Sequence, residues 1–404
     1  MRNGLSGFQP QRLTEARDAR GLTQVALSEL VNRTSSAISR WEKGEQLPEM
    51  DAVDSLSEKL NVPVSFFLRE QPEHGQAPLF FRSMVSTTQT LRRRTCARMR
   101  WTQDISLSLQ KWLDLPRVDV PQLSVTDFRQ INDEDIERMA AECRQRWGLG
   151  IGPISDLLLV LENAGISVIK EEVGSTTMDG LSNWSAADGR PYILIAKDKD
   201  TCVRSRLDAA HELGHLVLHK NLREVDLKSP DAFKEIERQA FQFAGAFLLP
   251  AESFMTEVWS PSLNTFQALK PRWKVSIGAM VKRAAQLDMI TPDTERLFWK
   301  YYGARGWRKR EPLDEALAPE EPRLLSRSVR LLIDERVVSK GDLLEEFRLS
   351  SSDIESLCGL PRGYFKSSDG EVLVMPQLKN RTSNEDRDIT GTVVQFPVSN
   401  RNDN

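Results

Sequence analysis

Cysteine is scarce in this chain and forms no recognisable metal-binding pattern. Four cysteines occur in 404 residues, and no two of them stand in a CxxC pair. No secretory signal precedes them, and scattered cysteines of this kind are typical of reduced thiols in a cytoplasm. We therefore do not expect a structural zinc ion bound by cysteine.

Long apolar runs are also missing. No stretch approaches the roughly 20 residues that a membrane-spanning helix needs, and the N-terminal segment MRNGLSGFQPQR lacks the apolar core of an export signal. We expect a cytoplasmic protein without a membrane partner. The formal net charge of −3 excludes a uniformly basic nucleic-acid coat, so any contact with DNA must come from a local patch.

Histidine is rare as well, but it is concentrated. Three of the four histidines lie in RSRLDAAHELGHLVLHK, residues 204–220. His211 and His215 stand four residues apart, so on a helix both imidazoles lie on one face and can reach a single zinc ion. Glu212 would lie beside the open coordination position, where a carboxylate can act as general base on zinc-bound water. The alternative is a chance HExxH pattern in a histidine-rich helix.

A catalytic zinc usually has three protein ligands. His219 would lie about 12 Å along a continuous helix from His211, so we interpret it as a core or supporting histidine. In KEIERQAFQFAGAFLLP, Glu237 falls on the edge of an apolar helix face, whereas Glu235 points nearly the opposite way. We therefore predict Glu237 as the third ligand. The competing interpretation of Glu237 is a salt bridge with Arg206 or Arg238.

The first 70 residues have the punctuation of a small helical domain. Thr23 and Thr34 occupy N-cap positions, and Gly21 and Gly44 lie at helix ends. Such a pattern predicts short helices around 11–19, 24–31, 35–43, 50–60 and 63–68.

The second and third of these helices have the spacing of a helix-turn-helix, in which the second helix enters the major groove of DNA. A helical bundle that binds protein is the alternative. The predicted DNA contacts are Gln24, Ser35, Ser36, Ser39, Arg40 and Lys43.

The remaining chain is predicted to be mainly helical. Helical patterns cover 80–115, with a basic run at 92–100, then 134–162, 204–219, 232–249 and most of the chain to about 357. Residues 166–196 predict a small twisted sheet with a turn at Asp188-Gly189, and TVVQFPV in the polar tail is strand-like. Proline-containing boundaries divide the chain into 1–70, a linker and basic helix at 71–120, a metal-binding domain at 121–290, and a helical region of open role at 291–404.

Several spaced motifs together resemble a known family. The segments MDGLSNW, GRPYILIA, RSRLDAAHELGHLVLH and IERQAFQFAGAFLLP resemble the ImmA/IrrE family of zinc metallopeptidases over about 150–290. The resemblance implies an α+β zincin-like domain in which a glutamate on the next helix completes the metal site. Phe241 departs from the asparagine of many members, which puts a supporting hydrogen bond in doubt. Residues 8–68 resemble the Xre/Cro-type DNA-binding domain.

The combination implies a multidomain, mainly α protein with a regulatory function. We expect it to bind a double-stranded DNA operator, with binding as a homodimer left open, and to cleave a transcription factor, thereby controlling phage, mobile-element or stress genes. Two alternatives stay open. One is a repressor whose zinc domain senses a ligand or metal without proteolysis, and the other is a toxin–antitoxin partner protein.

Overall fold

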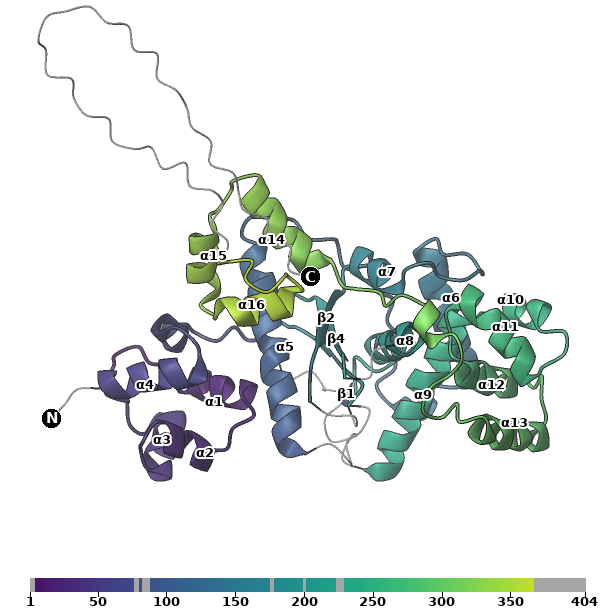
Figure 1. The fold of residues 1–404 in the computed structure, drawn as a ribbon, viewed down its shortest axis with the longest axis horizontal. Coiled ribbons are helices and arrows are strands. Elements are labelled where there is room, and N and C mark those ends of the chain that lie inside the picture. The colour runs from purple at the N-terminus through teal and green to yellow at the C-terminus, as the bar shows by residue number, and fades with distance from the viewer. Residues whose placement is uncertain are drawn as a thin grey trace, which may run out of the picture. The chain divides into compact units, whose positions relative to one another are not determined.

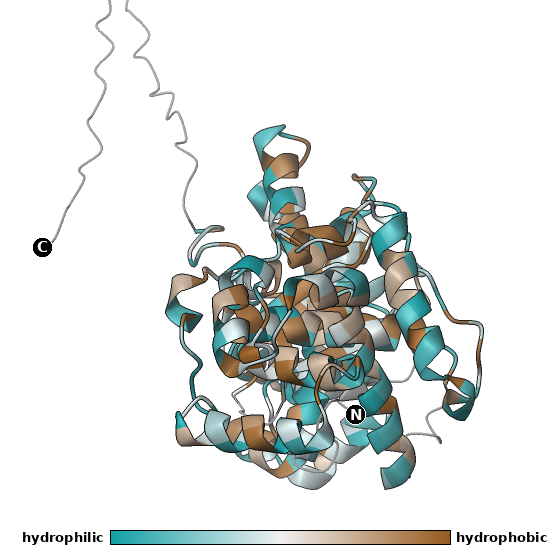
Figure 2. Cartoon of the chain, turned by 90° about the vertical axis from the view of Figure 1, so that its right-hand side faces the viewer, coloured by the Kyte–Doolittle hydropathy of each residue, from teal (hydrophilic) through white to brown (hydrophobic). Residues whose placement is uncertain are grey.

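The computed structural model describes residues 4–75, 80–81, 88–174, 178–198, 201–222 and 229–366. Over these residues the chain is mainly helical with one small sheet, as the sequence predicts. Figure 1 shows the order of the elements, and Figure 2 shows hydrophobic residues on the inward sides of the helices. The strand predicted for TVVQFPV in the tail lies outside the described residues.

The N-terminal region consists of four α-helices and a 3₁₀-helix. Thr23 and Thr34 accept hydrogen bonds from the backbone N–H groups of Ala26 and Ala37, so both predicted N-caps are confirmed. The fifth predicted helix is a 3₁₀ turn. The elements are α1 (Pro10–Ala19), α2 (Gln24–Leu30), α3 (Ser35–Glu42), α4 (Met50–Leu60) and η1 (Val64–Leu68).

The prediction of a helix from residue 80 is wrong at its start. Phe80–Phe81 form strand β1, and helix α5 (Gln89–Leu109) begins nine residues later. A backbone partner on another strand decides this local structure: β1 pairs antiparallel with β3 (Gly180–Trp184). Strand pairing of this kind depends on tertiary contacts that a single-sequence pattern does not contain.

The sheet has four strands in the order β1-β3-β4-β2. β3 and β4 (Pro191–Ala196) form an antiparallel hairpin, and its turn includes Gly189 at φ +64°, in agreement with the predicted Asp-Gly turn. β2 (Ser167–Glu171) runs parallel to β4. The predicted sheet at 166–196 is therefore confirmed, and β1 is an additional strand from the predicted linker and basic-helix segment 71–120.

Two helices carry the metal motif. Helix α8 (Cys202–Leu218) packs against β3, β4 and α9 (Pro230–Leu248). Gly214 permits close packing of α8 on α9, since a Cβ atom there would lie 3.1 Å from the carbonyl oxygen of Ala240. Helices α6 (Asp133–Arg146) and α7 (Leu157–Asn163) cover the same core. The 3₁₀-helix η2 (Phe128–Gln130) precedes α6.

Two of the C-terminal helices, α15 and α16, begin at serine caps. Ser339 and Ser350 accept hydrogen bonds from the N–H groups of Asp342 and Asp353. The apolar residues of α14–α16 belong to one core with those of α1, α4, α5 and one face of the sheet. The elements after α9 are α10 (Ala251–Glu257), α11 (Leu263–Trp273), α12 (Ile277–Gln286), α13 (Pro292–Ala304), η4 (Asp314–Ala316), α14 (Leu324–Asp334), α15 (Lys340–Phe347) and α16 (Ser351–Cys358).

Candidate metal centre

The structure brings His211, His215 and Glu237 together in the interior. The two histidines lie one turn apart on α8, and Glu237 faces them from α9. His211 Nε2 lies 3.1 Å from His215 Nε2, and the Glu237 carboxylate oxygens lie 3.4 Å and 3.2 Å from these nitrogens. All three residues are buried, and their three potential ligand atoms lie within 4.8 Å of one another.

This donor set fits a zinc ion. Two imidazole nitrogens and one carboxylate oxygen form the protein half of a catalytic zinc site, and a fourth position stays open. Burial alone raises the pKa of the Glu237 carboxyl, but its interactions with His211 and His215 outweigh burial and hold that pKa below its usual range. An ionised carboxylate beside two imidazoles is an environment that favours a cation.

The salt-bridge interpretation of Glu237 is not what the structure shows. Arg206 pairs with Glu320. Arg238 pairs with Glu235 at 2.8 Å on the outer side of α9. Glu235 is thus the more solvated of the two glutamates, as the helical periodicity predicts, and the inner one faces the histidines.

A chain of hydrogen bonds behind His215 fixes the direction of its lone pair. The Gln239 amide nitrogen donates to the carbonyl oxygens of Phe128 (2.8 Å) and Ile131 (3.3 Å), so its Oε1 must accept from His219 Nε2 (3.0 Å). The other nitrogen of His219, Nδ1, is then an acceptor for His215 Nδ1–H at 3.0 Å. His215 Nε2 is left with its lone pair facing the metal position.

His219 therefore supports the site without entering it, as the sequence indicates. It follows the last residue of α8 and is fully buried. Burial lowers the pKa of His219 to about 3, helped by His215. The neutral imidazole is the form that the hydrogen-bond chain requires.

Glu212 lies against strand β3. A Cβ atom built on Gly180 would fall 2.7 Å from Glu212 Oε1. The Gly180 position must therefore carry no side chain for the carboxylate to keep its place. This glycine is a functional residue that sequence reasoning missed, although it stands within the MDGLSNW motif.

Phe241 replaces the expected polar neighbour with an aromatic wall. Its ring centroid lies 4.2 Å from that of His211, at an interplanar angle of 47°. Phe241 stands one turn after Glu237 on α9. The ring therefore packs on the imidazole of a candidate ligand, where the asparagine of the similar family would offer a hydrogen bond.

The predicted DNA contacts lie on and around α3. Ser35, Ser36, Arg40 and Lys43 are exposed, and Ser39 is half-buried. Gln24 is partly engaged within the domain, since its amide donates to Glu42 Oε2 at 2.7 Å. The exposed residues run from the first turn of α3, at Ser35 and Ser36, to its C-cap, Lys43.

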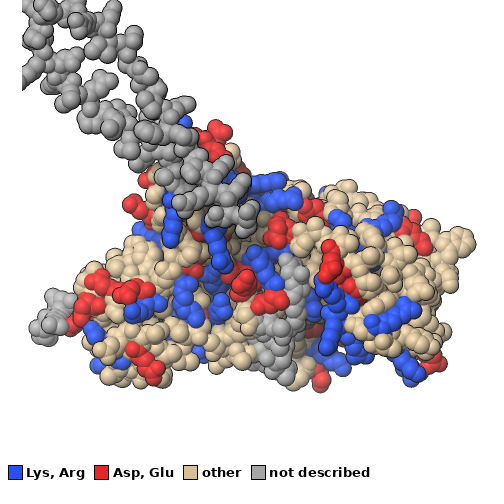
Figure 3. Space-filling model, viewed as in Figure 1, with Lys and Arg blue, Asp and Glu red and all other residues tan. Residues whose placement is uncertain are grey.

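The basic run at 92–100 includes arginines with structural contacts, among them the buried Arg98. Arg98 is buried on α5, where it donates to Glu171 at 2.8 Å and also pairs with Asp353. Arg20 of α1 pairs with the same aspartate at 2.6 Å. We call Arg20, Arg98, Glu171 and Asp353 the α5 charge cluster. Over the face drawn in Figure 3, basic and acidic side chains are intermixed.

Comparison with known families agrees with these two sites. Residues 161–285 match the family described as IrrE N-terminal-like domain, a family of peptidases, and residues 13–67 match the helix-turn-helix family. No curated protein matches the chain. In the described part of the chain, no helix is both long and apolar enough to span a membrane. The chain thus contains one region similar to helix-turn-helix domains and a second region similar to the IrrE N-terminal-like domain of peptidases.

Proposed function

We propose that this protein is a DNA-bound regulator that cleaves another regulatory protein by zinc-dependent peptide hydrolysis. The observation that carries the proposal is the buried convergence of His211, His215 and Glu237, with Glu212 one residue from the first ligand. A purely structural helix pair would not need two imidazoles and a carboxylate at one point of its interior. The helix-turn-helix domain supplies the regulatory half of the proposal.

The roles of the side chains follow from their positions. His211, His215 and Glu237 would hold the ion. The hydrogen-bond chain through Gln239 and His219 would keep His215 Nε2 oriented toward it. Zinc, when bound, would polarise the scissile carbonyl and acidify a water molecule. Glu212 would take a proton from the attacking water and deliver it to the leaving amine. Gly180 would leave room for that carboxylate to move between the two steps.

The sheet suggests how a protein substrate is held. β3 is the strand beside Glu212, and on its side away from β4 it pairs with Phe80–Phe81 of β1, the two residues of that segment that the structure describes. Extended peptides bind sheets by adding a strand, with backbone hydrogen bonds providing affinity. We infer that the substrate is an extended segment that pairs along this side of β3, in place of β1 or beyond it.

The DNA-binding half would use the exposed face of α3. Ser35, Ser36 and Arg40 are placed for base edges in the major groove, with Ser39 and Gln24 beside them and Lys43 directed at phosphate. Domains of this type usually read paired half-sites, so we propose a homodimer on a double-stranded operator. The cleaved protein would be a transcription factor, and the controlled genes would belong to phage, mobile elements or stress responses.

Comparing protein termini in cells tests the proposal directly. Cells that express the wild type under inducing conditions should accumulate new termini from one transcription factor. Glu212→Gln should abolish them while zinc and DNA binding remain. Glu252→Gln is the matched control, because Glu252 is exposed on α10 and distant in sequence from the motif. If Glu212→Gln derepresses the controlled genes as well as the wild type does, the protein is a non-proteolytic sensor.

A further inference from the structure

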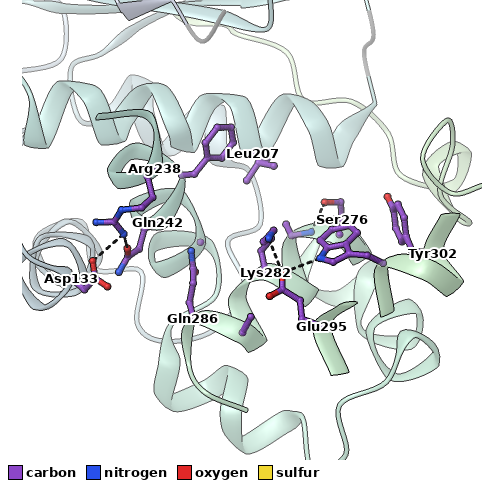
Figure 4. A pocket seen from close by; sticks show the side chains of 15 residues that line it. Asp133, Leu207, Arg238, Gln242, Ser276, Lys282, Gln286, Glu295 and Tyr302 are labelled. Carbon is purple, nitrogen blue, oxygen red and sulfur yellow. Dashed lines mark hydrogen bonds and ion pairs between the residues drawn. The ribbon is translucent and has the colours of Figure 1, made fainter. Parts of the chain in front are cut away.

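A cavity of about 770 Å³ adjoins the metal centre. Its lining comes from α9, α12 and α13, with Leu207 contributed by α8 (Figure 4). Two lining residues connect it to the ligands. Leu207 lies one turn before His211, and the Phe241 ring packs directly on the His211 imidazole. The cavity and the metal centre therefore share a wall.

The charged groups of this cavity are already paired within the protein. Lys282 donates to Glu295 at 2.7 Å, and Trp299 Nε1 donates to the same carboxylate at 3.0 Å. At the opposite end in Figure 4, Arg238 contacts Asp133 at 3.1 Å and Gln242 at 2.5 Å. A ligand would gain little from carrying a charge, because each fixed charge here has its counter-charge.

Between these two polar ends, apolar and aromatic residues line the cavity together with Gln286 (Figure 4). The apolar part consists of Leu207, Phe241, Ala279, Ala285 and Trp299. Gly278 brings α12 close to α13, since a Cβ atom there would contact the Trp299 ring at 3.4 Å. Small residues on α12 facing aromatic rings on α9 and α13 leave space for a flat or branched apolar group. Such pockets commonly bind ligands through apolar contacts with a few orienting polar groups.

We propose that this cavity is the specificity pocket of the peptidase, which binds a large uncharged side chain, aromatic or branched aliphatic, of the substrate residue next to the scissile bond. The inference rests on the proposed function. Its occupant is assigned to the peptide because the wall of the pocket, Phe241, is in contact with a metal ligand. The proposal requires that a side chain bound in the pocket leaves its own backbone within reach of the metal and Glu212.

Binding of hydroxamates to the zinc-loaded full chain tests this pocket without requiring cleavage. Peptidyl hydroxamates that carry a phenylalanine, leucine, glycine or aspartate side chain would be compared by calorimetry. We expect the phenylalanine and leucine compounds to bind roughly 10- to 100-fold more tightly than the glycine compound. The aspartate compound should bind no better than glycine. Equal affinities for all four would overturn the proposal, whether or not a natural substrate is cleaved.

Two variants locate the effect. Ala285→Trp should fill the pocket and Trp299→Ala should remove its wall, and each should abolish discrimination while the glycine hydroxamate binds as before. Leu297→Ala is the matched control on α13, where Leu297 is 44% exposed and outside the lining. Unchanged discrimination in both pocket variants contradicts the assignment. If free indole binds tightly and no hydroxamate competes with it, the cavity binds a free ligand and not a substrate side chain. That result would also overturn the proposal.

Discussion

The metal centre and the α5 charge cluster are two buried groups of ionisable side chains that differ in their balance of acidic and basic groups. In the α5 charge cluster, the carboxylates of Glu171 and Asp353 face the guanidinium groups of Arg98 and Arg20. In the metal centre, the one carboxylate faces two imidazoles whose nitrogens converge on the same point. The first group is electrostatically complete within the chain. The second presents lone pairs that a cation would complete, so its chemistry points to a ligand.

The largest effect on folding is expected in the α5 charge cluster. Asp353→Ala leaves the guanidinium groups of Arg20 and Arg98 without their shared carboxylate, and breaking a buried pair in this way costs about 3–5 kcal/mol. Denaturant unfolding should show this loss. Asp51→Ala, which breaks an exposed pair with Arg33 at 2.8 Å, should cost at most about 1 kcal/mol. Equal effects of the two substitutions would remove the distinction between buried and exposed pairs.

The pKa of a second buried carboxyl group, that of Glu162, is shifted in the opposite direction to that of Glu237. Glu162 accepts hydrogen bonds from the N–H groups of Arg323 and Leu324, but burial dominates and raises its pKa from 4.5 to about 7. The folded state therefore holds a proton that the unfolded state releases between these pH values. Stability contributed by protonated Glu162 should be present below pH 4.5 and fall as pH rises to 7, by roughly 3 kcal/mol.

Unfolding curves measured between pH 4.5 and 7 test whether the stability falls as the pH rises. Glu162→Gln removes the titrating group, so the wild type should lose stability relative to the variant as the pH rises. Parallel pH dependences of the two proteins would contradict the raised pKa.

The hydrogen-bond chain behind His215 should matter for the metal and little for the fold. Gln239→Leu removes the acceptor of His219, so the tautomer of His215 is no longer imposed. Substituting partners that orient metal ligands typically costs 10- to 100-fold in metal affinity, and competition with a chelator would measure this. Gln242→Leu, less than one turn further along α9, is the matched control and should bind zinc normally. Equal zinc affinity of both variants would show that the chain does not orient the ligand.

In contrast to the two buried groups, the exposed basic residues of α3 and its C-cap are expected to affect DNA binding. Arg40→Ala should weaken operator binding by about 1–3 kcal/mol if this side chain contacts a base, whereas Lys43→Ala should lower the salt slope by about one unit. Titrations at several salt concentrations would separate the two effects. Full operator binding by a chain that lacks residues 1–75 would contradict a role for the whole domain.

Local spacing explains what could be predicted from the sequence. His211 and His215 belong to one helix, and Glu237 follows from the periodicity of the next, so short-range geometry was enough to find all three. The caps Thr23 and Thr34 are equally local. Features that depend on contacts between distant segments were not visible in this way.

The missed features share this nonlocal origin. Gly180 is significant only because β3 passes beside Glu212, and Gln239 only because α9 meets the end of α8. Strand β1 depends on a partner about 100 residues away. The sequence places Arg98 in a basic run, but its buried role depends on Asp353, 255 residues further along the chain. Periodicity assigns a residue to a face of its helix, but it does not identify what packs there.

Zinc stoichiometry of purified variants tests the central claim most directly. The wild type should bind about one zinc ion per chain, and His211→Ala and Glu237→Ala should lose most of it. His219→Ala should keep most of its zinc, and Asp353→Asn, in the buried cluster that is complete without a metal, should keep all of it. Full retention of zinc by Glu237→Ala would contradict the assignment of the metal centre.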